Sequence, residues 1–138
     1  MRIRVADRVF FYGTLMTPFN RQGRRRREQH LQFSGRGSIA AALFDLGIYP
    51  AAVPASEGRV WGEVHEIVGA PDFVLRALDE IEGHSPGEPE RSLYTRRSTL
   101  VTQEDGAVAD AWAYFYNAPL GRAERIPSGD YLEYLRMK

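Results

Sequence analysis

The strongest constraint on the fold is a short apolar run, Val9-Phe10-Phe11-Tyr12, which stops at Gly13. Such a run is typical of a buried strand. Gly13 can adopt backbone angles that are closed to other residues, and Thr14 after it adds a hydroxyl group. A strand that ends in this way presents several backbone N–H groups together, which suits a carboxylate or an oxyanion. Taken alone, these residues favour an ordinary turn at a strand end.

The rest of the chain predicts more strands and one firm helix. Near-continuous apolar residues predict a buried strand over 38–46, and alternating polarity predicts strands over 59–68, 93–102 and 108–116. The last two strands flank the turn signal Gln103-Glu104-Asp105-Gly106 and should form a hairpin.

The firm helix begins at Pro71 and ends at Gly83, both favoured at those helix positions. Its apolar stripe repeats every three or four residues and consists of Val74, Leu75, Leu78 and Ile81. Loops are expected over 47–54 and 117–125, with a turn at 56–58. Shorter helices are expected over 19–31 and 130–137. These elements predict an α+β fold of about five strands.

Length and composition predict a single globular domain over residues 1–138, because 43% of the residues are hydrophobic. No apolar run approaches the roughly 20 residues that span a bilayer, and the N-terminus lacks the apolar region of a signal peptide. The chain has no cysteine, which excludes disulfides and thiol nucleophiles. We therefore expect a cytoplasmic protein with no membrane segment.

Charge is unevenly distributed, although the formal net charge is zero. Residues 1–36 hold nine Arg against two acids, and the densest part is Arg24-Arg25-Arg26-Arg27. Such a run can bind nucleic acid or another polyanion. No aromatic residues interleave with it and no binding motif surrounds it, which argues against nucleic acid. The arginine run could instead form a solvated surface or contact another subunit. The sequence does not distinguish a monomer from a homodimer.

Five short motifs follow one another in a fixed order. They are Tyr12-Gly13-Thr14-Leu15-Met16; Asp45-Leu46-Gly47-Ile48-Tyr49-Pro50-Ala51; Val60-Trp61-Gly62-Glu63-Val64; Leu78-Asp79-Glu80-Ile81-Glu82-Gly83 followed by Tyr94-Thr95-Arg96; and Ile126-Pro127-Ser128-Gly129-Asp130-Tyr131. In this order they resemble the γ-glutamylcyclotransferase-like family, most closely the branch of γ-glutamylamine cyclotransferases and avirulence-induced plant proteins. The resemblance implies a small, closed, mixed β-barrel-like sheet with helices outside it.

The resemblance also implies an enzyme that cyclises a γ-glutamyl amine or peptide to 5-oxoproline, without metal or cofactor. Glu82 matches the family's acid/base carboxylate. The turn formed by Tyr12, Gly13, Thr14 and Leu15 would bind the glutamyl α-carboxylate. Tyr94 and Tyr131 match tyrosine positions of the family that could orient the substrate, and Tyr49 could line the pocket mouth, although an ordinary loop position explains Tyr49 equally well.

The position of Glu82 at a helix end fits that role independently. The negative end of the helix dipole disfavours another anion there, and burial would act in the same direction. Both effects raise the pKa of a carboxyl group toward the range that suits a general acid or base at neutral pH. An exposed acid at a helix end is the alternative. Glu80 should be solvated, and Asp79 should be structural.

Other polar and aromatic residues are expected to be structural. Arg96 should form an ion pair with Asp79 or Glu82 rather than bind substrate. Four aromatic residues at strand spacing are expected in the core: Trp61, Trp112, Tyr114 and Tyr116. The three histidines, His30, His65 and His84, lack the spacing of metal ligands. Two alternatives to an enzyme remain: a non-catalytic module that binds a small ligand, and a polyanion-binding protein.

Overall fold

The computed structural model describes residues 7–13, 30–47, 49–69, 71–85, 87–88 and 91–137. Thr14, Leu15, the basic run 24–27 and most of the helix expected over 19–31 lie outside these residues. The described elements, in chain order, are β1 (Arg8–Phe11), β2 (Leu31–Asp45), β3 (Pro50–Ile67), α2 (Pro71–Glu82), β4 (Tyr94–Gln103), β5 (Val108–Tyr116), β6 (Glu124–Arg125) and α3 (Tyr131–Arg136).

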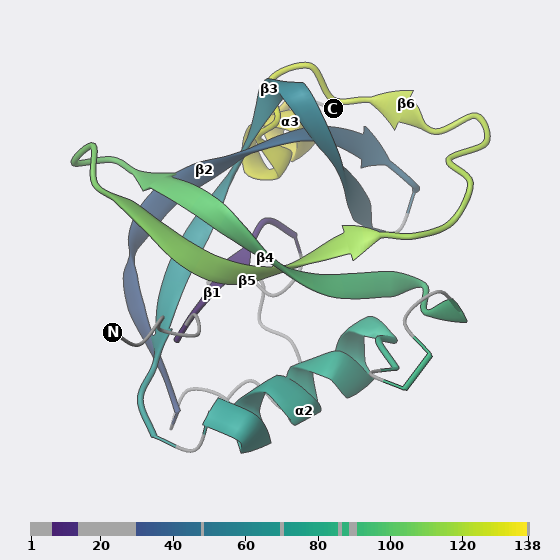
Figure 1. Cartoon of the computed structure of the whole chain (residues 1–138). Helices are drawn as coiled ribbons and strands as arrows, with labels where there is room; N and C mark the ends of the chain where they lie inside the picture. Colours follow the sequence, from purple (N-terminus) through teal and green to yellow (C-terminus); the bar gives the residue numbers. More distant parts are fainter. Residues whose placement is uncertain are drawn as a thin grey trace.

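Five of these strands close into a barrel (Figure 1). The strands pair in the order β3-β1-β5-β4-β2, and β2 pairs again with β3, which closes the ring; the two-residue β6 adds to β2. Only the β1–β5 pairing is parallel among the described strands, so the sheet is mixed. The predicted α+β class and closed mixed barrel are confirmed.

The longest pairing is the β2–β3 hairpin, which corrects two predictions. The loop expected over 47–54 is wrong, because β3 already begins at Pro50, opposite Asp45. Proline is tolerated there because the first residue of a strand need not donate to the ladder. The strand expected over 38–46 is too short, since β2 begins at Leu31. Residues 32–34 are exposed. The sequence there lacks the apolar pattern of a buried strand, so this part of β2 could not be predicted.

The turn expected at 56–58 falls inside β3, at a break in its register. Ala40 pairs with Arg59 whereas Ala41 pairs with Pro54, so the intervening residues of β3 bulge out of the ladder. A bulge bends a strand and increases its twist, which helps a sheet to close. The loop expected over 117–125 also contains the short strand β6.

The barrel interior holds the core. Its most deeply buried large side chains come from β1, β2, β3 and β4, from α2 and from the segment before α3: Val9, Phe10, Ile39, Leu43, Val60, Val64, Leu78, Val101 and Ile126. β1 and β3 approach so closely that a Cβ atom at Gly62 would overlap the carbonyl of Phe11. Glycine is therefore required at that position of β3.

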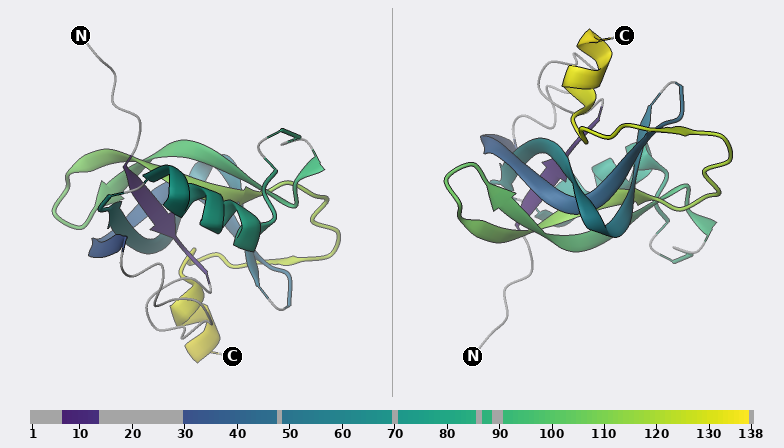
Figure 2. Two further views of the ribbon diagram at one scale, coloured as in Figure 1. Left: turned by 90° about the horizontal axis from the view of Figure 1, so that it is seen from below. Right: turned by 90° about the horizontal axis from the view of Figure 1, so that it is seen from above.

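The two described helices lie on different sides of the barrel (Figure 2). α2 buries Val74, Leu75 and Leu78, the stripe that the sequence predicts, although Ile81 stays 40% exposed. Asp130 caps α3, accepting a hydrogen bond from the backbone N–H of Glu133 at 3.2 Å. Neither described helix has the length and apolar content that crossing a membrane requires.

Candidate functional site

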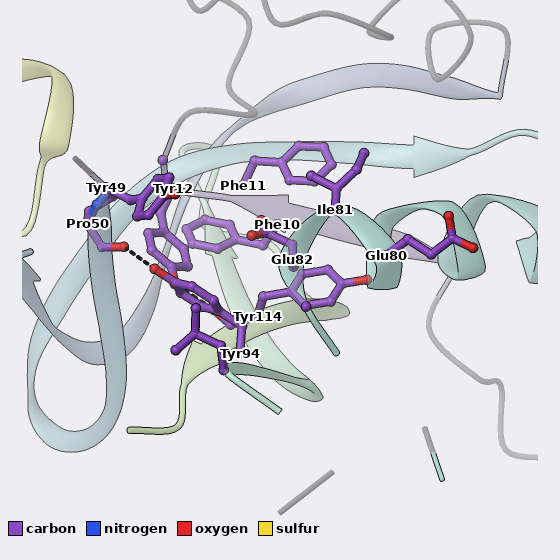
Figure 3. Close-up of a pocket in the computed structure, with 13 residues that line it drawn as sticks. Phe10, Phe11, Tyr12, Tyr49, Pro50, Glu80, Ile81, Glu82, Tyr94 and Tyr114 are labelled. Atoms are coloured by element: carbon purple, nitrogen blue, oxygen red, sulfur yellow. Dashed lines mark hydrogen bonds between the residues drawn. The ribbon is translucent and has the colours of Figure 1, made fainter. Parts of the chain in front are cut away.

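A pocket opens where β1, the β2–β3 turn, the end of α2, β4 and β5 meet (Figure 3). Its volume is about 210 Å³, below the roughly 300–1,000 Å³ of sites for drug-sized ligands. It is lined by Phe10, Phe11, Tyr12, Gly13, Tyr49, Pro50, Glu80, Ile81, Glu82, Gly83, Leu93, Tyr94 and Tyr114. The pocket therefore suits a small ligand.

Glu82 is the last residue of α2, and its side chain enters the pocket half-buried. Figure 3 shows it beside Phe10, above the ring of Tyr114. The helix ends at this point because Gly83 takes a φ of +73°. The backbone N–H of His84 then donates to the carbonyl of Asp79 at 2.8 Å, which completes the last turn. The carboxylate is thus held by a well-defined helix terminus.

The buried carboxylate of Asp79, one turn before Glu82, ties this end of α2 to the barrel. Asp79 is 4% exposed and accepts from Arg96 Nε at 2.8 Å and from the Tyr114 hydroxyl at 2.6 Å. The Arg96 guanidinium also lies 4.7 Å from the ring centre of Trp112. The predicted ion pair between Arg96 and Asp79, and the structural role of Asp79, are confirmed.

Three buried tyrosines form the wall of the pocket. The Tyr12 hydroxyl donates to the backbone carbonyl of Tyr114 at 2.5 Å and accepts from the N–H of Ala52 at 3.3 Å. The Tyr94 hydroxyl donates to the carbonyl of Pro50 at 3.0 Å. These bonds connect β1, β3, β4 and β5 around the pocket and tie the wall to the barrel.

Burial is the main cause that raises the pKa of each of these three phenols. The negative charge of Glu82 raises the pKa of Tyr12 and Tyr94 further. For Tyr114, the hydrogen bond to Asp79 is the second cause. All three groups are therefore neutral phenols at physiological pH.

The structure brings most of the predicted site residues together: Tyr12, Gly13, Tyr49, Glu82 and Tyr94 all line the pocket. Tyr131 is buried at the start of α3 and is not among the lining residues. A Cβ atom at Gly13 would lie 2.9 Å from Pro50 Cγ, so the turn after β1 passes close to the start of β3.

Sequence reasoning missed part of the lining. The sequence predicts Tyr114 in the core. The residue is indeed buried, at 2% exposed, but it also forms part of the pocket wall. Phe10 could have been found, because it shares a strand face with Tyr12, two residues later. Pro50, Ile81 and Leu93 each adjoin a predicted site residue, but nothing in the local sequence separates them from ordinary strand or helix ends. Glu80, predicted to be solvated, is exposed and reaches the pocket rim.

The charged groups of the lining are both acidic. Glu80 and Glu82 line the pocket, and no Arg, Lys or His is among the described lining residues. The described parts of the chain also contain no group of three or more His, Asp or Glu side chains arranged to hold a metal ion. The arrangement provides a carboxylate that can move a proton, set in an aromatic wall.

Comparisons with known proteins agree with this architecture. The chain is 35% identical over 127 residues to the γ-glutamylcyclotransferase family protein YtfP of Escherichia coli K12, covering 91% of this chain and 96% of YtfP. The solution structure of E. coli YtfP superposes with a TM-score of 0.64 at 33% identity, covering 95% of this chain and 99% of that one.

A second solved structure, YkqA from Bacillus subtilis, superposes with a TM-score of 0.68 over 96% of this chain. At 23% identity it shows the fold alone, and this chain spans 42% of its length. Residues 9–133 match the profile of the family described as gamma-glutamyl cyclotransferase, AIG2-like. The chain therefore belongs to the γ-glutamyl cyclotransferase, AIG2-like family.

Proposed function

We propose that this protein cyclises a γ-glutamyl amine or γ-glutamyl peptide to 5-oxoproline and releases the amine. The observation that carries the proposal is the side chain of Glu82, which enters a small aromatic pocket from the end of α2. Membership of the γ-glutamyl cyclotransferase family supports the same reaction class. Fold alone would not be sufficient, because one fold serves many functions.

The proposed reaction uses Glu82 as general base and then as general acid. Glu82 takes a proton from the substrate's α-ammonium group, and the freed amine nitrogen attacks the γ-carbonyl carbon of the same molecule. The tetrahedral intermediate then expels the leaving nitrogen, which receives that proton from Glu82. The ring nitrogen gives up its second proton to the released amine, which departs as an ammonium ion. One amide bond forms and one breaks, so no metal, oxidant or second substrate is required.

Because both reacting groups belong to one molecule, holding them in an attacking geometry supplies much of the rate. The wall tyrosines, whose hydroxyls are hydrogen-bonded to backbone carbonyls of the barrel, support this role. We assign the turn of Tyr12, Gly13, Thr14 and Leu15 to the substrate's α-carboxylate, and the presence of Tyr12 and Gly13 in the pocket lining supports this assignment. Backbone N–H groups would also stabilise the oxyanion.

A donor screen tests the proposal. The purified protein would be incubated with γ-glutamyl alkylamines, γ-glutamyl amino acids, γ-glutamyl-ε-lysine and glutathione, and 5-oxoproline would be quantified by mass spectrometry. We expect product from at least one donor class, above a no-enzyme control for spontaneous cyclisation. If no donor yields product while ligands still raise the melting temperature, the protein is a binding module with this fold and the proposal is wrong.

A further inference from the structure

The hydroxyl hydrogens of the three wall tyrosines all point to fixed acceptors of the protein. Tyr12 donates to the carbonyl of Tyr114, Tyr94 to the carbonyl of Pro50, and Tyr114 to the carboxylate of Asp79. A phenol has one hydrogen to donate but can also accept through its oxygen. None of the three hydroxyls can therefore donate to a ligand without breaking a bond within the protein.

The hydrogen of Tyr114 is the most firmly committed. Its acceptor, the carboxylate of Asp79, is held in place by the ion pair with Arg96. The hydrogen of Tyr12 is also committed, and its oxygen already accepts from Ala52. Among the described residues, no donor is directed at the oxygens of Tyr94 and Tyr114, and Tyr94 is the more exposed of the two, at 7% against 2%. Burial raises the pKa of the Tyr94 phenol, which therefore stays protonated.

The resulting pocket offers acceptors and aromatic faces to a ligand. The carboxylate of Glu82 and the oxygen of Tyr94 can accept hydrogen bonds inside the pocket, and no basic side chain is among the lining residues that the structure describes. Aromatic faces attract cations through their quadrupole, and more strongly when water is excluded. A group with positive charge and several N–H donors fits this environment, whereas an anion meets like charge and no hydroxyl donor.

We propose that Tyr94, together with the aromatic faces of Tyr12 and Tyr114, is the ammonium-recognition site of this pocket, with the Tyr94 oxygen accepting a hydrogen bond from the ligand's ammonium group. The inference deepens the proposed function, and rests on it for the identity of that group as the α-ammonium of a γ-glutamyl substrate. It follows that the substrate's α-carboxylate and oxyanion take their hydrogen bonds from backbone N–H groups and not from these tyrosines.

Two inert ligands that differ only in the ammonium group test the inference without turnover. L-methionine sulfone imitates a γ-glutamyl amide, with a sulfone in place of the reactive carbonyl and a methyl group in place of the leaving nitrogen. The matched ligand, 4-(methylsulfonyl)butanoate, keeps the carboxylate and the sulfone and lacks the amine. Isothermal titration on the wild-type protein should give a dissociation constant about a hundredfold lower for methionine sulfone, since hydrogen bonds to charged groups are the strong ones.

The variant Tyr94→Phe keeps the ring and removes the oxygen. We expect it to reduce the ratio of the two affinities about tenfold, chiefly by weakening the binding of methionine sulfone. The control is Tyr134→Phe, which removes a hydroxyl that donates to Asp45 at 2.6 Å outside the pocket and should leave the ratio unchanged. Thermal denaturation of both variants confirms that each is folded before titration.

The inference is overturned if the wild-type protein binds both ligands equally or binds neither, or if the ratio is the same in Tyr94→Phe as in the wild type. Failure of the proposed function would look different, because it appears in the donor screen as absence of 5-oxoproline. Ammonium discrimination without turnover would therefore retain the recognition site and reject the catalysis.

Discussion

Arg96 on β4 and Asp79 on α2 form an ion pair of 2.8 Å whose side chains are 18% and 5% exposed. The same carboxylate accepts the hydroxyl hydrogen of Tyr114 on β5. The pair therefore joins the end of α2 to two barrel strands, one turn before Glu82. The contact thus anchors the helix end that carries Glu82, although neither Asp79 nor Arg96 lines the pocket.

Removing Asp79 should destabilise the protein. Asp79→Ala leaves the Arg96 guanidinium and the Tyr114 hydroxyl without their acceptor in a buried site, and breaking such a pair costs about 3 kcal/mol or more. Urea denaturation followed by circular dichroism measures the change in the free energy of unfolding. The control is Arg91→Ala, which removes an ion pair with Glu88 at 3.8 Å between largely exposed side chains and should cost about 0–1 kcal/mol. Equal costs for the two variants would contradict the structural role of Asp79.

Gly129 should be intolerant of any side chain. Its φ is +70°, and a Cβ atom there would overlap the backbone of Arg59, while the carbonyl of Gly129 accepts from the N–H of Trp61 at 2.8 Å. Gly121 has a similar φ of +59° with open space around it. Gly121→Ala should cost about 1 kcal/mol of backbone strain, whereas Gly129→Ala should cost at least about 2 kcal/mol more. Similar thermal unfolding of the two variants would argue against the packing of the segment before α3 onto β3.

Alkaline pH should destabilise the folded protein through the wall tyrosines. The folded-state pKa values of Tyr12, Tyr94 and Tyr114 are raised above the usual value of about 10. Their contribution to stability is therefore complete below about pH 10 and is lost as the pH rises from there toward the folded-state values. Absorbance at 295 nm should show fewer tyrosines ionising near pH 10 in the native protein than in the urea-unfolded chain. Identical titrations would contradict the burial of this wall.

The sequence predicted the local elements well and the long-range pairings less well. β5 spans Val108–Tyr116, and α2 spans Pro71–Glu82, as their periodicity and end residues indicated. The early start of β3 at Pro50 was missed because proline and a turn motif indicate a loop when read alone. Only pairing with the distant β2 makes that segment a strand.

The same distinction applies to the site. Glu82, Tyr12 and Tyr94 could be selected because each lies in a motif that resembles the family. The place of Tyr114 in the pocket could not be predicted in this way, because its hydroxyl bonds to Asp79, 35 positions earlier in the chain. Alternation along β5 indicates burial, but it does not reveal which cavity a buried ring lines.

The most direct test of the central claim compares two carboxylates at the end of α2. Glu82 enters the pocket half-buried, whereas Glu80 is exposed at its rim, so Glu80→Gln is a matched control for Glu82→Gln. With the best donor from the screen, initial rates of 5-oxoproline formation should fall by roughly 10²–10⁴ in Glu82→Gln, the usual loss for a general acid/base, and by less than about fivefold in Glu80→Gln. A Glu82→Gln protein that is folded and retains a rate within tenfold of the wild type would contradict the role of Glu82.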